Sequence, residues 1–81
     1  VGPDREEIDR LIERSARLLR NGDVAPARLL LERASSGGDG RALFSLAETY
    51  DPVALRQLNV LGLRGDAARA RTYYERAASA G

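Results

Sequence analysis

The chain has 81 residues, of which 43% are hydrophobic and 31% charged, and its net charge is +1. This composition supports one small folded domain, and the near balance of charge argues against a nucleic-acid partner. Because the sequence contains no cysteine, histidine or lysine, it excludes disulfides, zinc-thiolate sites, the commonest general base and the Schiff-base nucleophile.

Residues 4 to 20 are predicted to form an amphipathic helix. Asp4 followed three places later by Glu7 is an acidic form of the capping box, and Asn21 with Gly22 marks the end of the helix. Two acid-before-base pairs at i,i+4 support it, Glu6 with Arg10 and Glu13 with Arg17. Its apolar residues recur at helical spacing: Ile8, Leu11, Ile12, Leu18 and Leu19.

Two shorter helices are predicted next. Asp23 is expected to cap the second helix, which residues 35 to 38 end, and Asp39 is expected to cap a third that runs to about Tyr50. The residues expected to face the core are Ala27, Leu30, Leu31 and Ala34 in the second helix, and Ala42, Leu43, Leu46, Ala47 and Tyr50 in the third.

The last third of the chain contains two further caps. Asp51 with Pro52 predicts a short helix over residues 52 to 58, and the stretch from 59 to 65 reads as a connection. Asp66 is expected to cap the final helix, which carries Ala67, Ala70, Tyr73, Tyr74, Ala77 and Ala78. The sequence therefore predicts an all-α fold.

An internal repeat is the most informative feature of the sequence. Residues 22 to 38 match residues 65 to 81 at an offset of 43, with ten of seventeen positions identical, including the capping aspartate and both end glycines. Repeats of this period indicate stacked supersecondary units, each of which cannot bury its apolar face alone. Here the unit is a pair of helices.

Residues 42 to 81 resemble a Sel1-like repeat, which is related to the tetratricopeptide repeat. The resemblance lies in Ala42, Leu46, Ala47 and Tyr50 in the first helix, and in Asp66, Arg69, Ala70, Tyr73, Tyr74, Arg76, Ala77, Ala78 and Gly81 in the second. It implies an α-solenoid of two antiparallel helix pairs, stacked in a right-handed manner, within one domain over 1 to 81. Residues 4 to 38 are similar to a degenerate capping copy, and residues 39 to 81 form the second copy with an insertion at 51 to 65.

The predicted function is a non-catalytic protein-protein interaction or scaffold module, with no cofactor and no metal. The resemblance implies that the first helix of each pair lines a shallow concave surface, and an apolar partner segment is expected against the insertion. The candidate partner-binding residues are Arg10, Arg14, Arg17, Arg41, Ser45, Glu48, Leu55, Leu58 and Leu61.

The same residues also have purely structural interpretations. The arginines of the first helix also fit a solvated face neutralised by Glu6 and Glu13, and part of the insertion's apolar content would only seal the end of the stack. One ring of the Tyr73 and Tyr74 pair is expected in the core and the other at a groove edge.

Two other functions stay open: a structural cap or spacer of a longer Sel1 array, and a regulatory appendage of an envelope protein. The lack of lysine is typical of a GC-rich bacterial genome, and the lack of methionine indicates an excised piece or a processed product. We expect no membrane insertion, because no apolar run approaches the roughly 20 residues of a spanning helix, and we expect a monomer. The sequence does not decide between a cytoplasmic and a periplasmic location.

Overall fold

A computed structural model describes residues 2–60 and 63–80, and every regular element in that part of the chain is a helix. The helices are α1 (Arg5–Arg20), α2 (Val24–Ser35), α3 (Gly40–Glu48), α4 (Pro52–Gln57) and α5 (Ala67–Ser79). The predicted all-α fold and the short helix after Asp51 are confirmed. The predicted contact Leu61 lies outside the described residues, as do Gly62 and Gly81.

Aspartate side chains fix where four of these helices begin. In each, a carboxylate oxygen accepts a hydrogen bond from a backbone N–H of the first turn, at 2.8 Å for Asp4, 3.1 Å for Asp39, 2.9 Å for Asp51 and 3.0 Å for Asp66. Asp23 stands at the predicted N-cap of α2, but its side chain makes no capping hydrogen bond, so the predicted capping contact is wrong. Its ψ of 72° departs from the extended backbone that a capping side chain favours.

The two matching segments of the sequence are both helical. α2 begins at Val24 and α5 at Ala67, which are 43 residues apart and so correspond in the sequence repeat. In both segments, therefore, a helix begins at the same position of the sequence repeat.

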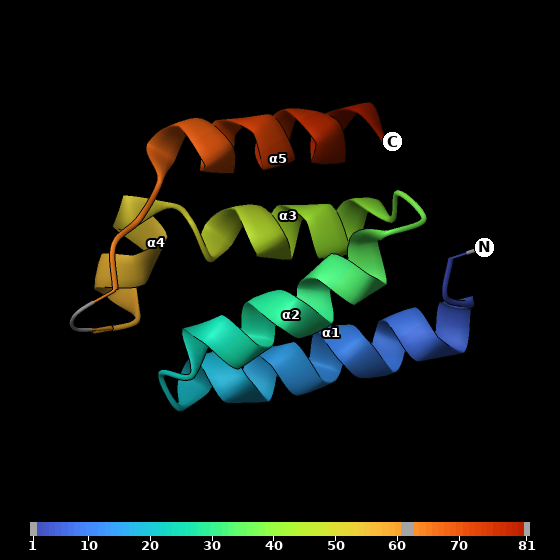
Figure 1. Cartoon of the computed structure of the whole chain (residues 1–81), viewed down its shortest axis with the longest axis horizontal. Helices are drawn as coiled ribbons and strands as arrows, with labels where there is room; N and C mark the ends of the chain where they lie inside the picture. Colours follow the sequence, from blue (N-terminus) through green and yellow to red (C-terminus); the bar gives the residue numbers. More distant parts are fainter. Residues whose placement is uncertain (1, 61–62, 81) are drawn as a thin grey trace.

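The long helices pack in chain order (Figure 1). α1 contacts α2, α2 contacts α3, and α3 contacts α5, while α4 lies at the end of α3. Each long helix runs back along the one before it, so that α3 has a neighbour on both sides and α5 has one.

The core lies where α2, α3 and α5 meet. Its central cluster consists of Leu31, Leu46, Tyr50 and Ala70, with Ile12, Tyr73 and Tyr74 packed against it. All the residues predicted to face inward from α2 and α3 are buried except Leu30, which is half-buried. In α5, by contrast, Ala67 and Ala78 are exposed, because nothing among the described residues covers that side of α5.

The segment between α3 and α5 is attached to the end of α3. The N–H of Asp66 donates to the carbonyl of Tyr50 at 2.7 Å, and Leu55 of α4 is only 3% exposed. Leu55, predicted to contact a partner, is therefore a packing residue and does not line an exposed patch. Among the described residues, no helix has both the length and the apolar character required to cross a membrane.

Candidate interaction surface

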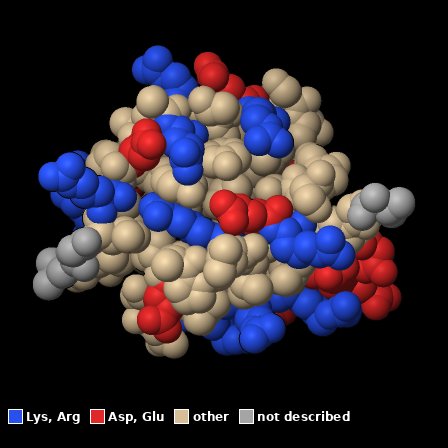
Figure 2. All heavy atoms as spheres, viewed as in Figure 1, with Lys and Arg blue, Asp and Glu red and all other residues tan. Residues whose placement is uncertain are grey.

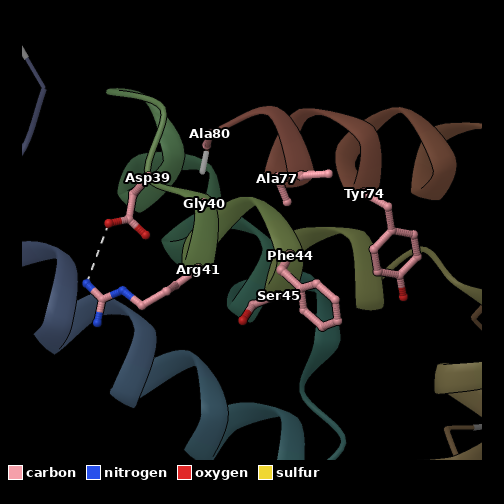
Figure 3. A pocket seen from close by; sticks show the side chains of 9 residues that line it. Asp39, Gly40, Arg41, Phe44, Ser45, Tyr74, Ala77 and Ala80 are labelled. Atoms are coloured by element: carbon pink, nitrogen blue, oxygen red, sulfur yellow. Dashed lines mark hydrogen bonds and ion pairs between the residues drawn. The ribbon is translucent and has the colours of Figure 1, made fainter.

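A groove lies between the beginning of α3 and the end of α5 (Figure 3), and we call it the α3/α5 groove. Its volume is about 790 Å³. It is lined by Asp39, Gly40, Arg41, Phe44, Ser45, Tyr74, Ala77, Ala78 and Ala80. Two of the predicted contact residues, Arg41 and Ser45, are thus part of one surface.

Aromatic and alanine side chains make up the apolar part of this groove. Phe44 is 49% exposed, and its ring meets the ring of Tyr74 edge to face, with centroids 5.2 Å apart. Arg41, Phe44 and Ser45 follow at i, i+3 and i+4 along α3 and therefore share one face of the helix. The groove offers an apolar wall with polar groups at one rim.

Small residues allow the two helices to approach at one end of the groove. A Cβ added at Gly40 would lie 3.3 Å from Cβ of Ala80 and 3.4 Å from the carbonyl oxygen of Ala77. A side chain at Gly40 would therefore press against Ala80, so the start of α3 packs closely on the end of α5.

Arg41 joins the rim of the groove to α1. Its guanidinium lies 2.8 Å from Asp9 of α1 and 3.5 Å from Asp39, and the hydrogen bond from Arg41 to Asp9 is the main reason that the pKa of this arginine is raised. All three side chains remain partly open to solvent. The arginine is therefore held in place while part of its surface stays accessible.

Tyr74 is fixed at the other end of the groove by Asp51. Its hydroxyl donates to Oδ2 of Asp51 at 2.8 Å. This bond is the main cause that lowers the pKa of Asp51, while desolvation followed by the same bond raises the pKa of Tyr74. Because the two pKa values are driven apart, the proton stays on the tyrosine near neutral pH, and the pair serves as a positional contact and not as a proton-transfer couple.

The three arginines predicted on the first helix border a separate hollow of about 510 Å³. It is lined by Glu7, Arg10, Leu11, Glu13, Arg14 and Arg17. Arg10 lies 3.8 Å from Glu6 and Arg17 lies 3.2 Å from Glu13, so both predicted i,i+4 pairs are present. In the face drawn in Figure 2, basic and acidic side chains are likewise interspersed.

The remaining predicted contacts lie near α4. Glu48 and Leu58 border a small hollow of about 160 Å³ together with Leu19, Thr49, Ala54 and Gln57. Leu58 is 37% exposed and Val53 is 52% exposed, so the insertion does present some apolar surface. Desolvation of the carboxyl, followed by the charge of Asp51, raises the pKa of Glu48 although the residue as a whole is exposed. Of the predicted contacts that the structure describes, seven are spread over three separate hollows and Leu55 is buried.

Phe44 is the residue of the α3/α5 groove that the sequence analysis missed. The chain has a single phenylalanine, and it lies outside the buried stripe of Ala42, Leu43, Leu46 and Ala47. A large aromatic residue out of phase with the core face of its own helix is a signal that would have identified it.

Within residues 2–60 and 63–80 there is no group of three or more Asp, Glu, His or Cys side chains that could hold a metal ion. Comparison of the chain with protein-family models, curated proteins and solved structures gives no match.

Proposed function

We propose that this chain is a non-catalytic protein-protein interaction module built from two Sel1-like helix pairs, α1 with α2 and α3 with α5. The observation that supports this proposal is the α3/α5 groove, which is lined by the half-exposed Phe44, by Tyr74 and by three alanines. An aromatic anchor on a concave apolar surface with a polar rim is typical of sites that receive an amphipathic helix.

Site-specific photo-crosslinking tests the proposal. The full chain would carry p-benzoylphenylalanine at position 44 and be expressed in cells of the source organism. The matched control carries the same group at position 29, because Leu29 is 67% exposed on α2 and does not line the groove. We expect a discrete protein adduct from position 44 and none of the same mass from position 29.

A substitution in the α3/α5 groove checks that formation of the adduct requires an intact groove. Ala77→Glu places a charge in the groove, at a position that is only half-buried, and far-UV circular dichroism verifies that the helices persist. The adduct at position 44 should then disappear. The same adducts from positions 44 and 29, or none from either, would contradict the proposal.

A second candidate is a structural spacer or cap within a longer Sel1 array. It is favoured by the exposure of Ala67 and Ala78 on α5, since the corresponding residues of α2, Val24 and Ser35, are buried. An array would cover the exposed side of α5 with a further helix pair.

A further inference from the structure

Tyr50, just after the end of α3, is contacted by side chains from two other helices. The guanidinium of Arg28 on α2 lies 3.9 Å from the centroid of its ring, and that of Arg69 on α5 lies 5.1 Å from the same centroid. On α5 the ring of Tyr73 stacks on Tyr50, with centroids 5.9 Å apart. We call these residues the Tyr50 cluster. None of them lines the α3/α5 groove, so the cluster is a separate feature of the molecule.

The positive charge of this cluster is poorly balanced by acids. Arg28 forms no ion pair within the described residues, not even with Glu32 one turn later on α2. Arg69 has one carboxylate near it, that of Asp66, whose Oδ2 lies 3.9 Å from Nε while Oδ1 caps α5. The distances from one ring centroid place the two guanidinium charges closer together than the Debye length of about 10 Å in roughly 0.1 M salt. An anion at this point is therefore attracted by both arginines.

Hydrogen-bond donors remain available in the cluster. Contact with an aromatic ring stabilises a cation without using its N–H groups. Nη1 of Arg28 and Nη2 of Arg69 donate no hydrogen bond within the described residues. The hydroxyl of Tyr50 accepts from Nη1 of Arg69 at 3.4 Å and has no acceptor for its own proton in that part of the chain. Three different side chains thus each keep a donor for a ligand.

The cluster is held in place on one side and open on the other. Tyr50 is only 9% exposed, and Arg28 donates from Nε to Oγ1 of Thr49 at 3.3 Å and from Nη2 to the carbonyl oxygen of Thr49. The side chain of Arg69, by contrast, is 55% exposed. A ligand can therefore reach the donors from the Arg69 side, and two of the three donor side chains need not be reordered when it binds.

We propose that Arg28, Arg69 and the hydroxyl of Tyr50 form a binding site for the phosphoryl group of a phosphate monoester. Such a group carries close to two negative charges near neutral pH and has three acceptor oxygens, one for each donor. A carboxylate carries one charge and two oxygens and is the weaker match. Arg76, whose guanidinium lies 5.6 Å from the ring centroid of Tyr73, adds positive charge beside the site. This site goes beyond the proposed protein-binding role and does not depend on it.

An NMR titration of the isotope-labelled full chain tests the site. The Nε–H resonances of the arginines are followed while glycerol 3-phosphate or N-acetyl-phosphoserine methylamide is added at constant ionic strength. We expect the resonances of Arg28 and Arg69 to shift together and to saturate, with a dissociation constant of about 1 mM or lower for at least one of the two compounds. Acetate should bind at least about tenfold more weakly than that compound.

Matched arginine variants separate this site from general attraction to a basic surface. Arg69→Gln removes one donor and one charge but keeps the backbone N–H that Asp66 caps, so the helix should persist by far-UV circular dichroism. It should weaken phosphate binding at least about tenfold. Arg71→Gln is the control, because it removes the same charge from an exposed residue of the same helix outside the cluster, and its effect should stay within about twofold. Tyr50→Phe keeps the ring and should weaken binding about threefold.

The titrations have distinct outcomes. Equal losses from Arg69→Gln and Arg71→Gln would overturn the inference, as would equal affinity for acetate or shifts that grow without saturating. Tighter binding of the phosphoserine compound identifies a phosphorylated protein side chain as the source of the phosphoryl group. Tighter binding of glycerol 3-phosphate identifies a free phosphate ester, and either order supports the site. Because the α3/α5 groove shares no residue with the Tyr50 cluster, Ala77→Glu should leave phosphate binding unchanged.

Discussion

At the scale of single residues, Asp51 connects more of the molecule than any other cap. Oδ1 accepts from the N–H of Val53 at 2.9 Å and so starts α4, while Oδ2 accepts from the hydroxyl of Tyr74 on α5 at 2.8 Å. Both bonds favour the ionised carboxylate, and they lower the pKa of Asp51 below its ordinary value.

Asp51→Asn isolates the effect of this charge, because asparagine is also a good capping residue. A pKa that is lower in the folded state adds stability above the unfolded pKa of about 3.9, and this contribution is lost as the pH falls through the folded pKa. We expect the variant to be about 1 kcal/mol less stable at pH 7, with the difference from the original chain shrinking toward pH 2.5.

Urea unfolding at pH 7, 4 and 2.5 measures that difference. Tyr74→Phe is the control, since it removes the same hydrogen bond and leaves the cap in place. A stability difference that stays constant with pH would show that the charge of Asp51 does not contribute.

At the scale of elements, the connection into α5 depends on a glycine. A Cβ at Gly65 would lie 2.8 Å from Cγ of Pro52 and 2.9 Å from the carbonyl oxygen of Tyr50, which is closer than packed atoms approach. The same carbonyl accepts the N–H of Asp66, so the backbone at this point must pass directly over the end of α3.

Gly65→Ala is therefore expected to destabilise the chain by about 1 to 3 kcal/mol, because either this close approach or the start of α5 has to shift. Gly37→Ala is the matched control: a Cβ there would meet only Cα of Gly2 at 3.8 Å, an ordinary contact. Thermal unfolding of both variants measures the effect, and equal midpoints for the two would show that the connection adapts freely.

The positions of the helices are the part of the structure that the sequence predicted best. Every helix is found near its predicted position. An aspartate before residues with helical apolar spacing marks a helix start, and this signal depends only on residues close in the sequence. Asp23 is the exception among the caps: it precedes α2 as predicted, but its backbone at ψ 72° is not extended and its side chain makes no capping hydrogen bond. Leu55 had the same apolar signal as Leu58, and only the path of the chain over the end of α3 decides which of the two is buried.

At the scale of the whole molecule, the core depends on Leu31. It belongs to α2, is fully buried, and shares one cluster with Leu46 and Tyr50 at α3 and Ala70 of α5. Removing it leaves a cavity between the two helix pairs, and we expect Leu31→Ala to cost about 2 to 5 kcal/mol.

A domain of this size has little stability in reserve, so Leu31→Ala should be largely unfolded at 37 °C by far-UV circular dichroism. Leu29→Ala is the control, since the same residue type on the same helix is 67% exposed there, and its effect should stay within about 0.5 kcal/mol. Similar losses in both variants would mean that the pairs are not joined through Leu31.

At this scale the candidate site was less predictable than the fold. The sequence identified Arg41 and Ser45 as contact residues and left open whether Tyr73 or Tyr74 lies at a groove edge. It did not predict that Arg41, Ser45 and Tyr74 border one groove, because that depends on how α3 and α5 cross. The contact of Arg28 with Thr49 links residues 21 positions apart and has no local signature. Phe44 could have been identified as a surface candidate from the sequence, because its position lies outside the apolar stripe of its helix.

The placement of the tyrosines gives the molecule an intrinsic optical probe. The chain has no tryptophan, and Tyr50, Tyr73 and Tyr74 all lie in its second half, with the rings of Tyr50 and Tyr73 stacked 5.9 Å apart. Tyrosine fluorescence therefore reports on the second helix pair, whereas helical dichroism reports on both. The guanidinium of Arg28 lies over Tyr50, so the emission of that ring also senses whether α2 is still attached.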